Sequence, residues 1–112
     1  MYARMMIGEA ISEDAIQECT AIYREHATPL TKEPGFLSSQ LLIEYGGAML
    51  ITLTVWKDRE TCLAYYRSRH YRQYVAGLQH LLVGDFVLKL FRCADETIPL
   101  ITGTIHDKEA QP

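Results

Sequence analysis

The sequence has few of the features that tie a protein to a membrane or a nucleic acid. Its longest apolar stretches, near residues 49–55 and 81–90, fall short of the ~20 residues that cross a bilayer. No charged region followed by a long apolar segment marks a signal peptide at the N-terminus. Lysine and arginine form no block, and the net charge is -3, which argues against nucleic acid as a partner. We therefore expect a cytoplasmic protein that binds neither membrane nor nucleic acid.

Cysteine is also scarce. The three cysteines, Cys19, Cys62 and Cys93, are odd in number and widely spaced, so they fit neither a disulfide framework nor a zinc site. A phosphate-binding glycine loop, HExxH, CxxC and Gly-x-Ser-x-Gly are missing as well. These absences predict reduced, buried thiols and no metal centre.

The length and composition of the chain indicate one small globular domain. The chain has 112 residues, of which 48% are hydrophobic and 22% charged, as in ordinary soluble domains. We expect one domain over residues 1–95 and a C-terminal extension over residues 96–112. Within the extension, Thr97–Ile105 is β-prone and is predicted to form an edge strand or to contact a partner subunit, before a mobile tail.

The order of predicted elements is strand, helix, two strands, helix, strand. The segments of β-strand character are Tyr2–Ala10, Phe36–Tyr45, Ala48–Trp56 and Phe86–Cys93. Ser12 begins the first helix, whose apolar residues recur every three or four positions. Asp58 begins the second, and Ser68 is expected to divide it, with a further helical piece over residues 69–78. This order predicts an α+β, ferredoxin-like β-α-β-β-α-β fold with an antiparallel sheet and its helices on one face.

The strand over residues 48–56 has two apolar faces. One face consists of Met49, Ile51, Leu53 and Val55, and the other of Leu50, Thr52, Thr54 and Trp56. Val87 and Phe91 of the last strand follow the phase of the first set. Because helices cover only one face, a second copy of the sheet is expected to cover the other. The pattern thus predicts a homodimer, in the form of a dimeric α/β barrel.

Four short segments resemble the antibiotic biosynthesis monooxygenase family. They are Pro34-Gly35-Phe36-Leu37, Gln40-Leu41-Leu42, Leu53-Thr54-Val55-Trp56-Lys57-Asp58 and Tyr65-Tyr66-Arg67-Ser68. In that family a Pro-Gly-Phe enters the second strand, a Trp closes the third, and a helix carries an aromatic residue and a Ser. The resemblance spans about residues 2–93. It implies a cofactor-independent oxidation of quinols or polycyclic phenols by oxygen in some members, and haem degradation in others.

The resemblance places a ligand between the helices and the sheet. The expected substrate-binding residues are Thr52, Thr54, Trp56, Tyr23, Tyr65, Tyr66 and Tyr74. His70 is the first candidate for the base that deprotonates a phenol or quinol, and His26 is the second. Each histidine also has a structural interpretation, His70 as a surface residue and His26 as a core residue. Thr52 stands where quinol-oxidising members carry an Asn, so an amide that stabilises an oxyanion is missing.

The haem-degrading branch offers an alternative. It requires a His at the position of Val75 and an Asn among residues 4–8, and the sequence has neither. Haem degradation is therefore disfavoured, while haem binding by His70 stays open. A small-ligand-binding dimer without catalysis, or a dimer whose helix–sheet space is filled, are further alternatives. The leading prediction is a cofactor-independent monooxygenase that acts on a small aromatic substrate.

Overall fold

The computed structural model describes residues 1–94 of the chain. Its elements are β1 (Tyr2–Glu9), α1 (Glu13–Leu30), β2 (Phe36–Ile43), β3 (Met49–Trp56), α2 (Arg59–Tyr66), α3 (Arg69–Leu78), a short 3-10 helix (Gln79–Leu81) and β4 (Val87–Arg92). The predicted order of elements is confirmed, and so is the division of the second helix near Ser68. The predicted strand over Thr97–Ile105 and the tail over residues 106–112 lie outside the described residues.

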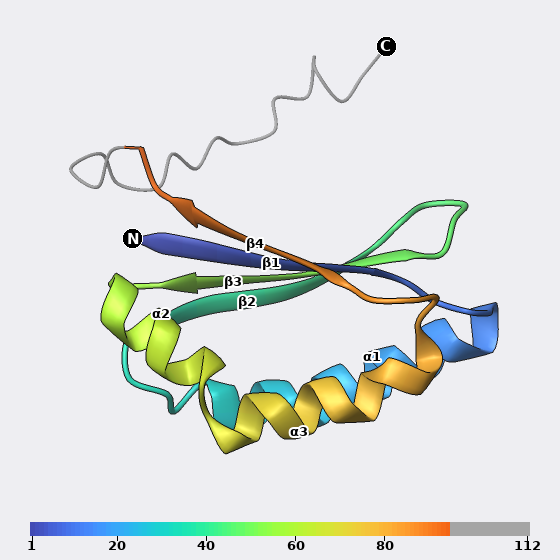
Figure 1. The fold of residues 1–112 in the computed structure, drawn as a ribbon, viewed down its shortest axis with the longest axis horizontal. Coiled ribbons are helices and arrows are strands. Elements are labelled where there is room, and N and C mark those ends of the chain that lie inside the picture. Colours follow the sequence, from blue (N-terminus) through green and yellow to red (C-terminus); the bar gives the residue numbers. More distant parts are fainter. Residues whose placement is uncertain (95–112) are drawn as a thin grey trace, which may run out of the picture.

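The four strands form one antiparallel sheet in the order β2-β3-β1-β4. The two strands that follow the helices therefore lie at opposite edges, and β1 and β3 form the centre. Figure 1 shows the three α-helices together on one side of this sheet. The arrangement is the predicted α+β, ferredoxin-like fold.

Each helix begins at a side chain that accepts a hydrogen bond from its first turn. Ser12 Oγ accepts from the Ala15 amide at 3.1 Å, and Asp58 Oδ1 accepts from the Thr61 amide at 2.8 Å. Ser68 Oγ accepts from the Tyr71 amide at 3.2 Å, which starts α3 as a separate helix. These N-caps satisfy amides that have no partner inside a helix. Because Ser68 starts α3 as a new helix, the rotation of α3 about its own axis does not follow from that of α2. The break at Ser68 therefore determines which α3 side chains face the sheet.

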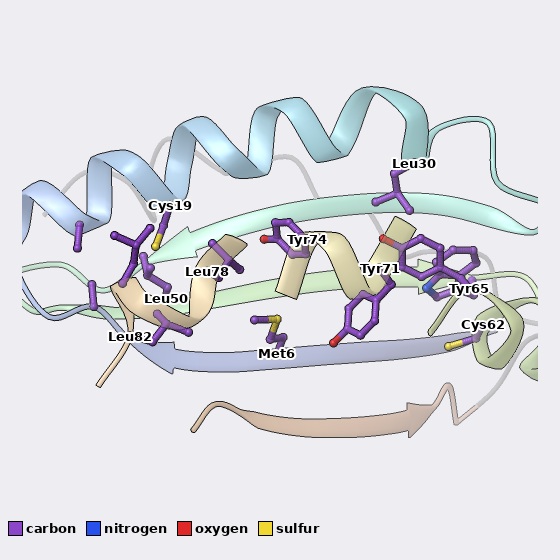
Figure 2. Close-up of a cluster of buried hydrophobic side chains, with 14 residues drawn as sticks. Met6, Cys19, Leu30, Leu50, Cys62, Tyr65, Tyr71, Tyr74, Leu78 and Leu82 are labelled. Atoms are coloured by element: carbon purple, nitrogen blue, oxygen red, sulfur yellow. The ribbon is translucent and has the colours of Figure 1, made fainter. Parts of the chain in front are cut away.

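The helix-covered face of the sheet holds the core. On β3 the residues Leu50, Thr54 and Trp56 are buried, and Met6 of β1 lies beside them opposite Thr52. Figure 2 shows Tyr74 over the middle of the sheet, Leu82 near Leu50 toward one end and Tyr65 at the other end. The β3 residues that were predicted to face the helices lie on the helix-covered face; they are Leu50, Thr52, Thr54 and Trp56.

The other face of the sheet is apolar and uncovered by any described residue. Met49 is exposed and Ile51, Leu53 and Val55 are half-buried on β3, as their alternation predicts. The pairing register brings Val87 and Phe91 of β4 onto the same face, where they are 50% and 45% exposed. A sheet with apolar side chains on both faces is stable when both are covered.

The helices described in residues 1–94 include none that is long and apolar enough to cross a membrane.

Candidate functional site

An aromatic cluster fills one end of the space between the helices and the sheet. Trp56, the last residue of β3, is 0% exposed, and the Tyr65 ring stacks on it with ring centres 5.0 Å apart. The Trp56 Nε1–H donates to Thr54 Oγ1 at 3.1 Å, and Tyr66 Oη lies 2.5 Å from the same oxygen. One buried threonine therefore satisfies the polar atoms of two aromatic side chains, as buried polar groups require.

His26 of α1 lies against this cluster and is 7% exposed. Its Nε2 lies 2.5 Å from Tyr65 Oη, and its ring stacks on Tyr74 with centres 3.9 Å apart. Burial, and to a lesser extent the nearby His70, lowers the pKa of His26 to about 4, and burial raises the pKa of Tyr65. Both groups are therefore uncharged at neutral pH. The second ring nitrogen, Nδ1, is buried and makes no hydrogen bond to the described residues.

His70 lies on the outer side of this pair. Its ring centre is 4.6 Å from that of His26, and the side chain is half-buried. Both histidines line a shallow hollow of about 200 Å³, the α1–α3 hollow, whose other lining residues are Ile22, Glu25, Gln73 and Tyr74. All six residues belong to the two helices, so this hollow opens between the helices and not onto the sheet.

The middle of the helix–sheet space is almost filled. Thr52 and Tyr74 line a small cavity of about 20 Å³, and their hydroxyls are 3.5 Å apart. Met6, Cys19, Leu50 and Leu78 are among the apolar residues that surround it. A cavity of this volume holds about one water molecule. An aromatic substrate therefore enters this region only if side chains move.

A second opening, larger than the α1–α3 hollow, lies on the other side of α3, toward β4. This α3–β4 groove has a volume of about 310 Å³ and is lined by Tyr66, Tyr71, Arg72, Val75, Ala76, Gln79, Phe86 and Leu88. The residues of α3 that line it differ from those that line the α1–α3 hollow, because helical geometry puts them on opposite sides of the helix. The groove and the hollow thus flank α3.

Arg4 of β1 lies against two of the tyrosines that line the α3–β4 groove. Its Cζ is 3.6 Å from the centre of the Tyr66 ring and 5.8 Å from that of Tyr71. The Tyr71 side chain is 8% exposed, and its hydroxyl is buried beside the Arg4 guanidinium. Burial raises the pKa of Tyr71, while the Arg4 guanidinium acts in the opposite direction.

The structure separates the predicted site residues into distinct places. Tyr66 lines the α3–β4 groove, and Thr54, Trp56 and Tyr65 are packed behind it. His26, His70 and Tyr74 meet at the α1–α3 hollow, and Thr52 lies at the small cavity. Tyr23 Oη binds Ser39 Oγ of β2 at 2.6 Å, away from both openings. The catalytic and substrate-binding roles of these residues stay predictions.

Sequence reasoning missed Arg4 and Tyr71. A signal for Arg4 existed, because it is the one cation in the strand phase that places Met6 and Gly8 on the helix face. Tyr71 is three residues before Tyr74 and seven before Leu78, so it shares their buried helical stripe, whereas His70 does not. Within residues 1–94, no group of three or more His, Cys, Asp or Glu side chains is placed to hold a metal ion.

Comparisons with known proteins agree with this architecture. The chain matches the structure of Rv0793 from Mycobacterium tuberculosis with a TM-score of 0.73 and 21% identity, covering 88% of this chain and 100% of that one. It matches SnoaB, a cofactor-independent oxygenase from Streptomyces nogalater, with a TM-score of 0.71 and 19% identity, covering 88% and 96% of the two chains. A conserved protein from Methanosarcina mazei Go1 gives a TM-score of 0.72 at 19% identity, with coverage of 82% and 92%. At these identities the likeness concerns the fold.

A comparison of the sequence with curated proteins found no match. The family model described as antibiotic biosynthesis monooxygenase matches residues 4–77, which is more than half of the chain. That span runs from Arg4 on β1 to the end of α3, so it contains both histidines and the whole aromatic cluster. The chain belongs to the antibiotic biosynthesis monooxygenase family.

Proposed function

We propose that the chain oxidises a small aromatic hydroxy compound of the quinol type with molecular oxygen, without a cofactor. The observation that carries the proposal is the α3–β4 groove, whose volume of about 310 Å³ lies at the lower end of the range for small-ligand sites. Its lining combines four apolar side chains with two tyrosines, an arginine and a glutamine. Family membership supports the reaction class, as does the shared fold of SnoaB.

In the proposed reaction, the substrate first loses a proton to become an electron-rich anion. One oxygen molecule then adds to a ring carbon, one of its atoms stays as a new carbonyl, and the other leaves as water with two substrate hydrogens. The protein's task is to hold the anion, because electrostatic stabilisation is commonly the largest catalytic contribution. Thr52 is unsuited to this task at its small cavity. The polar side chains that line the groove, among them Tyr66, Tyr71 and Arg72, are the proposed partners of the anion instead.

His26 and His70 are the proposed final proton acceptors, and because they lie across α3 from the groove, the substrate's proton would reach them through the Tyr65 hydroxyl and not by direct contact. The low pKa of His26 makes it a weak base, while its 2.5 Å contact with Tyr65 ties it to the aromatic cluster. His70 lies next to it and is half-buried, so it connects the pair to solvent. A proton that reaches the pair leaves through the α1–α3 hollow.

Oxygen consumption with a panel of quinols and polycyclic phenols tests the function. The wild-type protein is expected to consume oxygen with at least one of them. Tyr71→Phe should raise KM, because it changes the groove, and His70→Ala should lower kcat with little change in KM. A wild-type protein that is indifferent to every compound would remove the proposal. If both variants changed only KM, and by the same factor, the separate roles proposed for the groove in binding and for His70 in proton transfer would be wrong.

A second candidate function is ligand binding without catalysis. The hollow beside His70 is the place for such a ligand, whereas the helix–sheet space, with its cavity of about 20 Å³, is largely filled by side chains, which favours instead a structural or interaction dimer that binds no ligand. Haem is the first ligand to test for this alternative. The hollow beside His70, at about 200 Å³, is shallow and small for a porphyrin, so we expect no shift of the Soret band on titration. A shift that disappears in His70→Ala would favour the haem-binding alternative.

The proposed functional form is a homodimer in the cytoplasm. The apolar sheet face that no described residue covers has the strand alternation and extent that a second sheet packs against. A second copy of this chain is the proposed cover, which would make the dimeric α/β barrel. Cys19 and Cys62 are free and buried, in keeping with a reducing compartment.

A further inference from the structure

One end of the molecule has a wide groove that the proposed reaction does not use. It lies where the start of α1, the β2–β3 hairpin and Val83 meet, and we call it the α1–hairpin groove. Its other lining residues come from residues 9–17 and 43–48. Its volume is about 800 Å³, compared with about 310 Å³ for the α3–β4 groove.

Three large apolar side chains are exposed in the α1–hairpin groove. Ile11 is 57% exposed, Val83 54% and Ile43 47%. Ile43 pairs with Leu50, so its side chain lies on the helix-covered side of the sheet. This part of the groove therefore stays open when a second copy covers the other face of the sheet. Exposed apolar side chains that gather in one place are typical of a surface that a protein partner covers.

The backbone around this groove is held by hydrogen bonds between distant segments. The Val83 amide donates to the Glu9 carbonyl oxygen at 2.7 Å, and the Ala10 amide donates to the Ala48 carbonyl oxygen at 2.8 Å. These bonds join the end of β1 to the segment before β4 and to the β2–β3 hairpin. The groove is thus formed before a partner arrives, which lowers the entropy cost of binding.

The charged side chains of the α1–hairpin groove are all acidic. Glu9, Glu13 and Glu44 line it, and no Lys or Arg does. The surrounding sequence has the same character, because residues 5–23, 33–56 and 73–88 contain no Lys or Arg. An apolar surface bordered by carboxylates favours a partner surface that carries cations.

Such a surface lies at the opposite end of the same chain. Residues 57–72, which form α2 and the start of α3, carry five cations against two carboxylates, and we call them the basic end. The five cations are all exposed; they are Lys57, Arg59, Arg67, Arg69 and Arg72. Figure 1 shows α2 at the other end of the molecule from the β2–β3 hairpin and the start of α1. The chain therefore has two ends of opposite charge.

We propose that the α1–hairpin groove binds the basic end of a second copy of this chain. The corner between α2 and α3, with Arg67 and Arg69, would lie against Glu13 and Glu44. The contact joins two different surfaces, so each end of a pair keeps one unused surface and further copies add end to end. It is separate from the sheet face of the proposed homodimer and does not depend on the proposed function.

Sedimentation velocity of the full chain at two salt concentrations tests the inference. At about 1 M NaCl the Debye length is about 3 Å, so contacts between charged surfaces are screened and the remaining species gives the reference mass. At about 0.01 M NaCl the Debye length is about 30 Å, and the mass should rise above this reference as the protein concentration increases. A wild-type protein with the same mass at both salt concentrations would overturn the inference and leave the groove to a basic partner of another kind.

Charge reversals identify the two surfaces. Glu13→Lys should weaken the low-salt association about tenfold or more, and Arg69→Glu should do the same, because each places like charges against one another. An equimolar mixture of the two variants should associate again, since each then offers the other a surface of opposite charge. Glu44→Lys repeats the first reversal without changing the first turn of α1.

Arg24→Glu is the matched control, because it changes the net charge as Arg69→Glu does. Arg24 is exposed on α1 and belongs neither to the groove lining nor to the basic end. This variant should keep the low-salt association of the wild type. Unchanged association in both Glu44→Lys and Arg69→Glu would overturn the inference, as would a mixture of Glu13→Lys and Arg69→Glu that stays at the reference mass.

Discussion

The Tyr65 hydroxyl and His26 Nε2 lie 2.5 Å apart and join α2 to α1 through a buried hydrogen bond. Removing the hydroxyl in Tyr65→Phe leaves the imidazole nitrogen buried and unpaired. We expect the free energy of unfolding to fall by about 1–3 kcal/mol, measured by urea denaturation. Tyr23→Phe is the matched control, because Tyr23 is half-buried and water can replace its bond to Ser39. Equal losses in the two variants would contradict a special role for the buried pair.

The low pKa of His26 predicts a stability that depends on pH. Folding lowers this pKa from 6.5 to about 4, so the unfolded chain takes up the proton first as the pH falls. The contribution of His26 is complete above pH 6.5 and is lost progressively as the pH falls toward 4. By linkage the loss is about 3 kcal/mol at most. Urea denaturation across this range should show a shallower decline in His26→Gln, and parallel curves for the two proteins would be evidence against a neutral buried imidazole.

Thr54 and Thr52 face the same side of β3 but differ in what they satisfy. Thr54 Oγ1 accepts from Trp56 at 3.1 Å and lies 2.5 Å from Tyr66 Oη, whereas Thr52 Oγ1 has one contact of 3.5 Å. Thr54→Val should therefore cost about 2 kcal/mol, since it leaves two buried groups unpaired, and Thr52→Val less than about 1 kcal/mol. Thermal unfolding of the two isosteric variants compares them directly. The reverse order of Tm values would show that the hydrogen bonds of Thr54 contribute little.

Gly35 and Gly46 both have a positive φ, at 76° and 73°, but only one has space for a side chain. A Cβ at Gly35 would lie 2.1 Å from Thr61 Oγ1, while a Cβ at Gly46 would meet nothing within 4 Å. Gly46→Ala should cost about 1 kcal/mol for the backbone conformation alone. Gly35→Ala should cost about 1–3 kcal/mol more, because the turn into β2 must move away from α2. Chemical denaturation that finds equal costs would refute the steric part of this prediction.

The uncovered face of the sheet predicts how the chain associates. Ile51 lies near the middle of that face, so Ile51→Lys should break the proposed dimer while leaving each subunit folded. Sedimentation velocity at low micromolar concentration should show a dimer for wild type and a monomer for the variant. Ala21→Lys, on the exposed side of α1, should remain dimeric. A folded wild-type monomer under these conditions would rule out the second copy as the cover.

The sequence predicted the fold well because its signals are local. Ser12, Asp58 and Ser68 are short-range caps, and the structure begins a helix after each of them. The two apolar faces of β3 followed from alternation alone, and the register confirms the phase of Val87 and Phe91. Strand ends were less accurate, since β2 ends at Ile43 and β4 begins at Val87.

The candidate site was only partly predictable, because it depends on contacts between distant segments. Arg4 and Tyr66 are separated by more than half of the sequence, and no local sequence pattern around either residue predicts their contact. The histidines were chosen by chemistry, but the start of α3 at Ser68 sets their direction. That start turns His70 toward α1 and Tyr71 toward the groove. Periodicity gives the face of a helix only once its first residue is known.

The most direct test of the proposed monooxygenase activity is to follow which products receive the two atoms of molecular oxygen. The purified chain is incubated under ¹⁸O₂ with the best substrate from the quinol panel, and the product and the water are analysed by mass spectrometry. A cofactor-independent monooxygenase should place one heavy oxygen atom in the new carbonyl of the product and the other in water. A product without label, or no product above the rate without protein, would contradict the assignment of oxygenase chemistry to this chain.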